Sequence, residues 1–442
     1  MIAIRYSYMS SKNPVTASTR IHLIGIGGIG MSGLARLLRH EKKQVSGSDA
    51  TASDITAALE EEGVTFYPTQ QAANIDSDIE LVVYTEAMDS DHEEMKAARA
   101  LGVPMLNYFE ALAFAVNDYF LIAVSGTHGK TTTTAMLVDI FEAAGLDPTA
   151  VVGSLRTKTK SNFRFGKSKY AIVEACEYRQ DFLSLEPDVL VITNLEHDHV
   201  DFYPDLAAVQ QTFASLVAKV DEKGCIVAKQ TDPQVQPALA EAAVPVRNYQ
   251  EYLDPQLQLK VPGLHNLENA AAAAAVAAFC GVPAETIHQA LTDFAGTWRR
   301  YEYKGTVNGA AVYDDYAHHP TALRATITAT RELYPESRII AIFEPHTYTR
   351  TAALFAEFAK ALALADRVIL APIYAARETN ESGVSSRELT VKVTEYNPNV
   401  FYGESHEAIV EQIRQSTSSE DVVLVLGAGP ITQIADMVID TQ

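Results

Sequence analysis

The stretch Tyr119-Phe120-Leu121-Ile122-Ala123-Val124-Ser125-Gly126-Thr127-His128-Gly129-Lys130-Thr131-Thr132 indicates the fold of this chain. Its apolar first half is typical of a buried strand, and the glycine-containing second half leads into a helical stretch. In such a strand–loop–helix order, backbone N–H groups and a lysine surround phosphates, and a hydroxyl reaches Mg²⁺. We therefore predict phosphate contacts from Gly126, Thr127, His128, Gly129, Lys130, Thr131 and Thr132, with Thr131 on Mg²⁺.

One position departs from the general phosphate-loop pattern. That pattern has a glycine five positions before Gly129, where this chain has Val124. The alternative interpretation is a chance Gly-Lys-Thr at the start of a helix. The strand before the loop and the helix after it favour the phosphate loop.

On both sides of this loop, apolar strand-like runs alternate with helical stretches. The alternation predicts parallel sheets covered by helices, which is an α/β fold. The predicted strands are Arg20–Ile26, Gln44–Gly47, Leu81–Thr85 and Pro104–Leu106 before the loop, and Tyr170–Val173, Val189–Thr193, a strand near Val312, Arg338–Phe343, Arg367–Leu370 and Val422–Leu426 after it. Since the strand series restarts twice, we predict three units, over residues 19–115, 116–297 and 298–442, after a loose N-terminal extension of residues 1–18.

Composition narrows the function classes. The length of 442 residues agrees with three domains of roughly 150 residues each. The 35 Lys+Arg against 56 Asp+Glu give a formal charge of −21, so we expect neither nucleic acid nor a membrane as a partner. No apolar run reaches the roughly 18 residues of a membrane helix, and no signal peptide is expected. Cys176, Cys225 and Cys280 show no CxxC spacing, which suits a cytoplasmic protein.

A second glycine loop follows the first predicted strand. Gly25, Gly27, Gly28 and Gly30 stand between that strand and a helix, where glycines let a pyrophosphate approach the backbone. Asp49 follows about 20 residues later, where a ribose-binding acid is expected. The pattern predicts a dinucleotide or sugar-nucleotide site, and a glycine turn needed only for helix packing is the alternative. An NAD-dependent oxidoreductase built on this loop would leave residues 125–132 unexplained.

Acids and imidazoles follow two further predicted strands. They are Glu174, Glu177, Asn194, Glu196, Asp198 and His199. Carboxylates beyond the carboxyl ends of parallel strands, next to a phosphate loop, are where Mg²⁺ ligands belong. Glu177 and His199 are the candidate ligands, although histidine is unusual for an ion that prefers oxygen. For any single residue of the group, a surface charge is the alternative.

Three later clusters are candidate substrate contacts. His265 and Asn269 open an alanine-rich helix, for which helix capping is the alternative. Arg300 ends an arginine pair near the second boundary, where a guanidinium could clamp a phosphoryl group across a cleft. Two histidine-containing loops, Asp314–Pro320 and Glu344–Arg350, follow predicted strands and form a candidate substrate rim. Solvated loop polarity is the alternative for both loops.

The order of these motifs resembles the Mur ligases of peptidoglycan synthesis, from about Arg20 to Ala435. Within that family, Gly25–Ala35, Glu174–Arg179, Asp314–Thr321 and Pro345–Thr351 are similar to the branch that adds L-alanine. Several motifs in one order are more specific than any one of them. The resemblance implies a Rossmann-like UDP-binding domain, a central P-loop ATPase domain with a parallel sheet, and a C-terminal Rossmann-like domain for the amino acid.

The resemblance also implies substrates and residue roles. ATP, UDP-N-acetylmuramate and L-alanine would be the substrates of a monomer or homodimer, with two Mg²⁺ ions. The UDP moiety would lie on Gly25, Gly27, Gly28 and Gly30, near Ser48 and Asp49. Lys130 would hold the β- and γ-phosphates, Thr131 and Glu177 one Mg²⁺, and His199 the second. His265 and Asn269 would face adenine, Arg300 and Asp315 would reach the nucleotide from the third domain, and Tyr316, His318 and Arg350 would surround L-alanine and the lactyl carboxylate.

The implied reaction passes the γ-phosphoryl group of ATP to a carboxylate, and an amine then attacks the acyl phosphate. Lys130 and Arg300 would neutralise charge, His199 would serve the metal, and His318 is a weak candidate for the base. Sister ligases carry a modified lysine in the helix after the Asp-His motif, near residue 215, whereas here that stretch has no lysine before Lys219, in line with the alanine-adding branch. Thr347 stands where that branch often has arginine. The closest alternative is the sister ligase that attaches a murein tripeptide to the same UDP-sugar.

Overall fold

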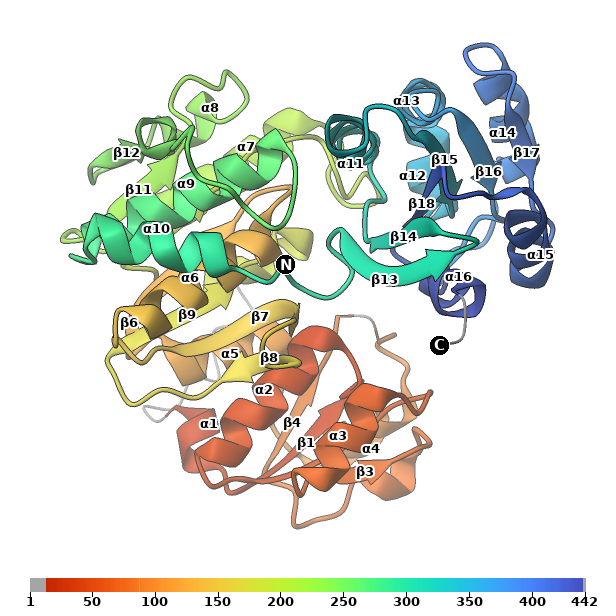
Figure 1. Ribbon diagram of the computed structural model, residues 1–442. Helices are drawn as coiled ribbons and strands as arrows, with labels where there is room; N and C mark the ends of the chain where they lie inside the picture. The colour runs from red at the N-terminus through yellow and green to blue at the C-terminus, as the bar shows by residue number, and fades with distance from the viewer. Residues whose placement is uncertain (1–12, 87, 440–442) are drawn as a thin grey trace.

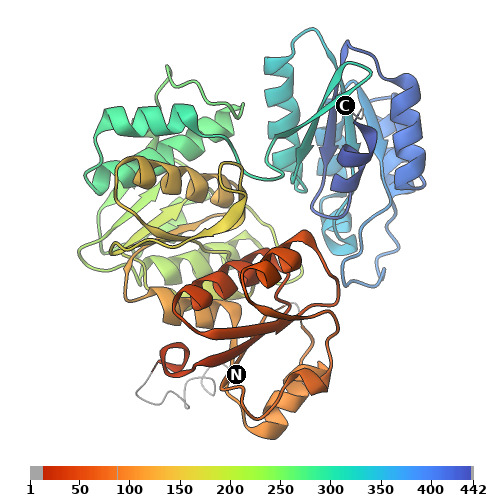
Figure 2. The ribbon, with the colours of Figure 1, turned by 60° about the horizontal axis from the view of Figure 1, so that its bottom comes forward.

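The computed structural model describes residues 13–86 and 88–439, and these fold into three α/β units (Figure 1). The first unit lies at the bottom of that view, the central unit at the left and the C-terminal unit at the right. Figure 2 shows the same three bodies after a rotation of 60°. Their sheets have the strand orders β3-β2-β1-β4-β5, β12-β11-β10-β6-β9-β7-β8 and β13-β14-β18-β15-β16-β17.

The first unit has a wholly parallel sheet. Its central strand β1 (Arg20–Ile24) lies between β2 (Gln44–Ser48) and β4 (Leu81–Tyr84), and β1 and β4 are apolar because helices cover both faces. The other elements are α1 (Pro14–Ala17), α2 (Ile29–His40), α3 (Asp54–Glu61), β3 (Thr65–Tyr67), η2 (Ala72–Asn74), α4 (Glu93–Leu101), β5 (Met105–Asn107) and α5 (Tyr108–Val116).

The central unit has a parallel sheet with one antiparallel edge strand, β8 (Ser161–Arg164), paired with β7 (Thr149–Arg156). Its middle strand β6 (Phe120–Ser125) runs directly into the phosphate loop and α6 (Lys130–Ala143). The other elements are β9 (Tyr170–Glu174), η3 (Tyr178–Ser184), β10 (Val189–Ile192), α7 (Leu206–Val217), β11 (Cys225–Ala228), α8 (Gln236–Leu239), β12 (Val246–Asn248), η4 (Tyr249–Tyr252), α9 (Leu264–Phe279) and α10 (Ala284–Asp293).

The C-terminal unit begins with an antiparallel hairpin, β13 (Glu302–Val307) and β14 (Ala310–Asp315), and continues as a parallel sheet. Its middle strands are β18 (Asp421–Leu426) and β15 (Arg338–Phe343). The other elements are α11 (Pro320–Leu333), α12 (Tyr348–Ala353), α13 (Phe355–Leu362), β16 (Arg367–Leu370), α14 (Ser386–Thr394), β17 (Val400–Tyr402), α15 (His406–Ser416) and α16 (Thr432–Val438).

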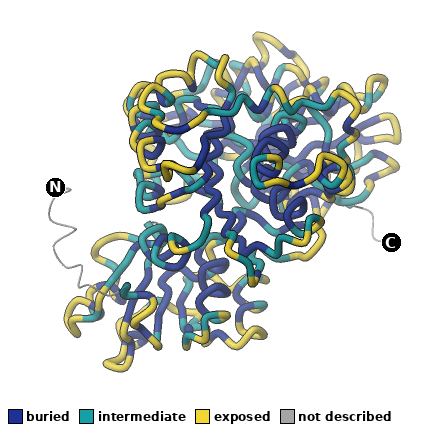
Figure 3. The backbone as a smooth tube through the Cα atoms, turned by 90° about the vertical axis from the view of Figure 1, so that its left-hand side faces the viewer, coloured by how far each residue is buried: buried dark blue, intermediate teal, exposed yellow. Residues whose placement is uncertain are grey.

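The alanine-rich helix α9 packs against α6 inside the central unit. Its alanines from Ala270 to Ala277 are buried together with Leu137 and Phe141 of α6. Small side chains let two helix backbones approach closely, so the alanine run is a packing face of the core. Figure 3 shows buried residues concentrated in the interior of the molecule and exposed residues at its periphery.

Helix α2 of the first unit packs on β7 and β8 of the central unit. Asn162 of β8 is fully buried there; its carbonyl oxygen accepts a hydrogen bond from Arg36 Nη1 (2.6 Å), and its Nδ2 donates to Ser32 Oγ (3.0 Å). The third unit is joined through Trp298, whose backbone N–H donates to Leu155 O (2.8 Å). Hydrogen-bonded contacts thus hold the three units against one another.

The predicted α/β fold with three sheets is confirmed. The predicted strands Arg338–Phe343 and Arg367–Leu370 agree residue by residue with β15 and β16. The strands β3, β7, β8, β11, β12, β13 and β17 were not predicted; β8 and β13 are polar edge strands without an apolar pattern, whereas β7 and β11 are apolar inner strands that the sequence reasoning missed. The expectation of a loose extension is wrong for residues 13–18, since α1 buries Val15 and Asn13 donates to Phe114 O (2.6 Å). Residues 1–12 lie outside the described part of the chain, and the proposed unit boundaries at 115 and 297 stay predictions.

Candidate active site

The phosphate loop joins the carboxyl end of β6 to the first turn of α6. Gly126 and Gly129 have φ values of +124° and +83°, which favour glycine. A Cβ at Gly126 would overlap Thr193, and a Cβ at Gly129 would overlap the amide of Asn269. The loop therefore lies directly against the end of β10 and the first turns of α9, which places the predicted adenine residue Asn269 beside the phosphate site.

Lys130 lies in this loop and forms an ion pair with Glu177, with Nζ 2.9 Å from Oε2. Both side chains are largely buried. Burial opposes the charged form of Lys130, but Glu177 and its neighbours outweigh it and raise the pKa of the lysine above its ordinary value. The ammonium therefore stays protonated at neutral pH and can neutralise phosphate charge.

Two groups of possible metal donors flank Lys130. Thr131 Oγ1 donates to Glu174 Oε2 at 2.8 Å, and Glu174 also accepts from Gly153 N at 3.0 Å. Cys176, Glu177 and His199 offer donor atoms that lie within 4.8 Å of one another. Thr131, which was predicted to share an ion with Glu177, is thus hydrogen-bonded to Glu174, and Glu177 pairs with the neighbouring Lys130.

Arg300 reaches this site from the start of the C-terminal unit. Its Nη2 lies 3.4 Å from Thr131 Oγ1, and its guanidinium lies over the ring of Tyr316, 4.9 Å from the centroid. The Asp315 carboxylate accepts backbone hydrogen bonds from Tyr301 (2.7 Å) and Ala317 (2.8 Å), so its position is fixed. Arg300 and Asp315 therefore present opposite charges next to the phosphate loop.

His265 lies at the start of α9 on the same side of the site. Burial lowers the pKa of its imidazole, while Asp315 opposes that change, and His128 and Arg300 reinforce it. The neighbouring Asn269 donates from Nδ2 to Asn266 Oδ1 at 3.2 Å. These contacts bring both predicted adenine residues together with groups from the phosphate loop and the third unit.

The rim of the C-terminal unit meets the central unit at Asp198. Arg350 Nη2 lies 3.0 Å from Asp198 Oδ1, and both side chains are buried. Burial opposes ionisation, but Arg350 holds the pKa of Asp198 well below its usual range. His318 Nδ1 lies 2.8 Å from Tyr316 O, and burial together with Arg350 holds the pKa of His318 well below its usual range. His318 is therefore neutral at pH 7.

The second glycine loop lies in the first unit, between β1 and α2. Gly25 has a φ of +81°, and Gly27 N donates to Asp49 Oδ2 at 2.9 Å, so Asp49 stands beside the loop as predicted. A Cβ at Gly30 would approach Tyr108 Cζ to 2.9 Å, whereas Gly28 has looser surroundings. Turn geometry thus favours glycine at Gly25, and packing favours it at Gly30 and also at Gly27, where a Cβ would approach Asp49 Oδ2 to 2.9 Å.

Ser48 is fully buried and its hydroxyl is already engaged. It donates to Glu94 Oε2 at 2.6 Å, in a cluster where Asn74 Nδ2 donates to Glu94 Oε1 at 2.6 Å. His22 Nε2 lies 3.7 Å from the same carboxylate. The side chain of Ser48 therefore serves the core of the first unit.

The predicted residues of the central and C-terminal units converge at the carboxyl edges of β6, β9, β10 and β14. Sequence reasoning named Glu174 in the group of possible Mg²⁺ ligands but chose Glu177 and His199 over it, although the position of Glu174 as the last residue of β9, next to β6, is a usable signal. It also did not select Asp198 as the partner of Arg350, and no sequence signal joins two residues 152 positions apart.

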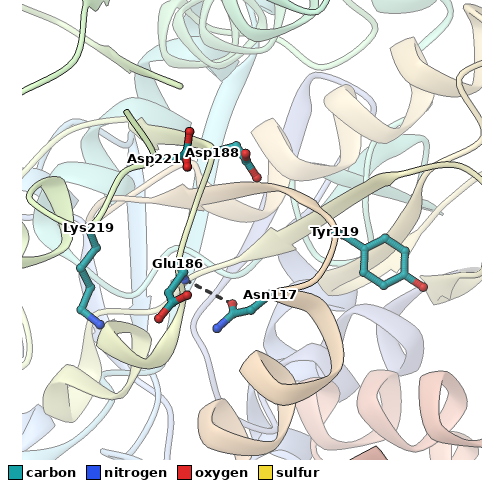
Figure 4. A pocket seen from close by; sticks show the side chains of 6 residues that line it. All are labelled: Asn117, Tyr119, Glu186, Asp188, Lys219 and Asp221. Atoms are coloured by element: carbon teal, nitrogen blue, oxygen red, sulfur yellow. Dashed lines mark hydrogen bonds between the residues drawn. The ribbon is translucent and has the colours of Figure 1, made fainter. Parts of the chain in front are cut away.

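A polar cavity of about 410 Å³ lies elsewhere, lined by Asn117, Tyr119, Glu186, Asp188, Lys219 and Asp221 (Figure 4). In it, the backbone N–H of Glu186 donates to Asn117 Oδ1 at 3.2 Å. These residues stand at the amino ends of β6 and β10, opposite the phosphate loop. Open α/β sheets bind ligands at the carboxyl ends of their strands, so the converging groups above define the candidate active site.

Comparison with known protein families covers all three units. The Mur ligase family catalytic domain matches residues 20–120, the Mur ligase middle domain residues 124–254, and the Mur ligase glutamate ligase domain residues 299–429. The UDP-N-acetylmuramate–L-alanine ligase of Agathobacter rectalis is 39% identical over 94% of this chain and 96% of that protein. The enzyme of the same name from Acetivibrio thermocellus is also 39% identical, over 94% and 95% of the two chains.

Solved structures agree with this similarity. The UDP-N-acetylmuramate–alanine ligase of Thermotoga maritima has a TM-score of 0.80 and 28% identity, covering 95% of this chain and 98% of that one. A murein peptide ligase from Psychrobacter arcticus has a TM-score of 0.72 and 26% identity, with the same coverages of 95% and 98%. Since all three units and almost the whole length are matched, the chain belongs to the Mur ligase family.

Proposed function

We propose that this chain is an ATP-dependent ligase that joins L-alanine to the lactyl carboxylate of UDP-N-acetylmuramate in peptidoglycan precursor synthesis. The observation that carries this proposal is the full-length similarity to proteins named UDP-N-acetylmuramate–L-alanine ligase. The murein peptide ligase alternative is not favoured, because the similarity to that structure is lower. An NAD-dependent oxidoreductase would leave the middle and C-terminal family matches without a role.

A carboxylate does not acylate an amine at neutral pH, because oxide is a very poor leaving group. Transfer of the γ-phosphoryl group of ATP gives an acyl phosphate, and the neutral amine of L-alanine displaces phosphate through a tetrahedral intermediate. The protein supplies position and positive charge. Lys130 in the phosphate loop and Arg300, 3.4 Å from Thr131, are the proposed cationic groups on the phosphates.

The donor groups beside the phosphate loop fit Mg²⁺ at two positions. Carboxylate and hydroxyl oxygens suit this ion, and Thr131 and Glu174 would hold one Mg²⁺ in our proposal. Glu177 and His199 would hold the second, which makes Glu177 shared between the metal and Lys130. Bound Mg²⁺ neutralises phosphate charge and lowers the barrier to attack on phosphorus.

In our proposal the UDP moiety lies against Gly25, Gly27, Gly28 and Gly30 of the first unit, beside Asp49. His265 and Asn269 would face adenine, with Asp315 fixing the nucleotide from the third unit. The N–H of Gly27 is engaged with Asp49, so Asp49 would position this loop as well as bind ribose.

Tyr316 and His318 would line the amino-acid site. Arg350 is held by Asp198, so we propose that it positions the loop of His199 and meets a substrate carboxylate only when the ion pair opens. The low pKa of His318 keeps its imidazole neutral but only weakly basic, and we assign no general base.

No helix in the described part of the chain is long and apolar enough to cross a membrane. We propose a cytoplasmic location, because all three proposed substrates are cytoplasmic metabolites, and a monomer or homodimer as the working form. The unit boundaries at 115 and 297 are likewise proposed as the divisions between UDP-sugar, ATP and amino-acid functions.

The deciding experiment measures phosphate release from ATP with UDP-N-acetylmuramate present. L-alanine, glycine, L-serine and murein tripeptide are added in turn, and the product is identified by mass. We expect turnover with L-alanine to exceed that with tripeptide. Higher turnover with tripeptide would assign the chain to the sister activity, and no ADP formation with any acceptor would reject the proposal.

A further inference from the structure

Three side chains that the proposed reaction does not require as metal ligands meet at the edge of the active site. His128 comes from the phosphate loop, Glu196 from the loop after β10, and His319 from the residue before α11. Each offers a donor atom, and the three donor atoms lie within 4.8 Å of one another. The group spans two units, since His128 and Glu196 belong to the central unit and His319 to the C-terminal unit.

Two of the three separations between these donor atoms match a tetrahedral metal site. Glu196 Oε2 lies 3.4 Å from His128 Nε2 and 3.5 Å from His319 Nδ1. With metal–ligand bonds of about 2.0–2.2 Å, neighbouring donors around tetrahedral Zn²⁺ stand about 3.4 Å apart. The two measured separations therefore need little adjustment to admit an ion. Two histidines and one glutamate are also a donor set found in zinc enzymes.

The hydrogen bonding around His319 leaves its Nδ1 able to coordinate an ion. Its Nδ1 accepts only a long bond of 3.3 Å from Thr321 N, so that nitrogen carries a lone pair close to the Glu196 carboxylate. Two acceptors facing each other at 3.5 Å are stabilised by a cation between them. His319 is 5% exposed, and its Nε2 has no hydrogen-bond partner in the described part of the chain.

Glu196 is held in place for this role by a neighbour. Thr321 Oγ1 donates to Glu196 Oε2 at 2.8 Å, across the boundary between the two units. Metal-binding carboxylates are commonly oriented by such a hydrogen bond from a second residue. The rings of His128 and His319 also lie close, with centroids 4.9 Å apart. The three ligands are therefore gathered before any ion binds.

We propose that His128, Glu196 and His319 form a binding site for Zn²⁺ that joins the central and C-terminal units. Two imidazoles with one carboxylate favour zinc-class ions over Mg²⁺, which prefers oxygen, whereas the Mg²⁺ positions proposed above hold at most one imidazole, that of His199. The fourth position is left to water or a ligand. Because His128 lies in the phosphate loop, bound Zn²⁺ holds that loop to the C-terminal unit and slows turnover at a fixed Mg²⁺ concentration.

The test uses the full chain without nucleotide. Zn²⁺ binding is measured by calorimetry, and Co²⁺ is used as a spectroscopic probe of the same site. We expect one tight Zn²⁺ site and visible Co²⁺ bands of tetrahedral type without a thiolate charge-transfer band. His319→Gln and Glu196→Gln should each weaken Zn²⁺ binding at least tenfold. His288→Gln, on an exposed histidine of α10, should bind as the unchanged chain does.

A competing donor group is Cys176, Glu177 and His199. Cys176→Ser distinguishes this group from the proposed site. If the Co²⁺ spectrum has a thiolate-to-cobalt band that disappears in Cys176→Ser, the ion lies at Cys176 and the proposal is overturned. Absence of Zn²⁺ binding, or equal affinity in His319→Gln, would also overturn it. His319→Gln and Glu196→Gln lie on different units. Loss of Zn²⁺ binding in both variants, with unchanged circular dichroism, therefore supports the site independently of local misfolding.

Discussion

Arg350 and Asp198 meet across the boundary between the C-terminal and central units as a buried ion pair, with Nε and Nη2 of the arginine each 3.0 Å from Oδ1 of the aspartate. Asp198 directly precedes His199, whose φ of +52° is uncommon for a residue other than glycine. The ion pair therefore fixes the loop that carries a candidate metal ligand, and it does so only when the two units are together.

Arg350→Gln should impair catalysis as a whole rather than amino-acid binding alone. The substitution leaves the Asp198 carboxylate buried without a cation, which costs about 3–5 kcal/mol for a buried pair. We expect kcat/KM to fall by at least 100-fold for both ATP and L-alanine. Steady-state kinetics with each substrate varied in turn provide the measurement.

The double variant Asp198→Asn with Arg350→Gln is the control for the uncompensated charge. It should be more stable to thermal unfolding than Arg350→Gln alone. If only the KM for L-alanine rises in Arg350→Gln, the arginine binds the substrate carboxylate directly and the positioning role is wrong.

Lys130→Ala should abolish ADP formation while UDP-N-acetylmuramate binding is retained. The ammonium is the cation of the phosphate loop, and removal of one group that stabilises developing charge costs about 10²–10³-fold in kcat. The proposed UDP-sugar loop lies in the first unit and Lys130 in the central unit, so calorimetric titration of the UDP-sugar should be unchanged.

Because Lys130 also neutralises Glu177, 2.9 Å away, Lys130→Ala is compared with the double variant Lys130→Ala, Glu177→Gln. Both should be inactive, and the double variant should unfold at the higher temperature. Wild-type turnover in either variant would remove the phosphate loop from the mechanism.

Glu174→Gln should weaken the response to Mg²⁺. Its carboxylate lies 2.8 Å from Thr131 Oγ1, the hydroxyl that phosphate loops use for Mg²⁺. We expect the Mg²⁺ concentration for half-maximal phosphate release to rise at least tenfold. Chelation by EDTA should stop the unchanged enzyme, and added Mg²⁺ should restore it. Glu186→Gln, exposed at the opposite edge of the sheet, is the matched control and should respond to Mg²⁺ normally.

The sequence allowed the sheets to be predicted because their signals are local. An apolar run such as Arg338–Phe343 is followed by polar loop residues, and each glycine loop is flanked by a strand and a helix. Edge strands such as β8, with the sequence Ser-Asn-Phe-Arg, carry no such pattern, and pairing with β7 makes them strands. Local pattern thus predicted most inner strands and the edge strand β5, whereas the polar edge strand β8 depends on tertiary pairing; the apolar inner strands β7 and β11 carry a local pattern that was missed.

The site was only partly predictable for a related reason. Motif position placed Lys130, Glu177 and His199 in one region, and the structure brings them together. Which partner each residue takes depends on how the loops pack, so the contact of Thr131 with Glu174 could not be read from spacing. Contacts between units, such as Glu196 with Thr321, depend on a docking geometry that no short stretch of sequence encodes.

Asn162→Ala should loosen the first unit from the central unit. The amide of Asn162 is fully buried; it accepts from Arg36 Nη1 and donates to Ser32 Oγ, so its loss leaves a buried donor and a buried acceptor without this partner, at about 1–3 kcal/mol. We expect a lower unfolding temperature and faster proteolysis between the units. Lys158→Ala, on an exposed residue of the same hairpin, should stay within about 0.5 kcal/mol of the unchanged chain. Equal effects of the two substitutions would contradict a bonding role for Asn162.

Glu344→Gln should stabilise the C-terminal unit above neutral pH. Burial raises the pKa of Glu344 to about 7, although Ile431 N and Arg299 oppose that shift, and His406 Nε2 lies 3.7 Å from the carboxylate. A carboxyl with a raised folded pKa contributes stability that is fully present below about pH 4.5 and is lost as pH rises through 7. The ionised carboxylate therefore costs at most about 3 kcal/mol at pH 8. Glutamine keeps the acceptor for Ile431 N without the charge.

The unfolding temperature of Glu344→Gln should lie above that of the unchanged chain at pH 8 and close to it at pH 5. The exposed control Glu381→Gln should show no such dependence on pH. A lower unfolding temperature for Glu344→Gln at pH 8 would mean that ionised Glu344 is stabilised by His406 and Arg299 more than burial destabilises it.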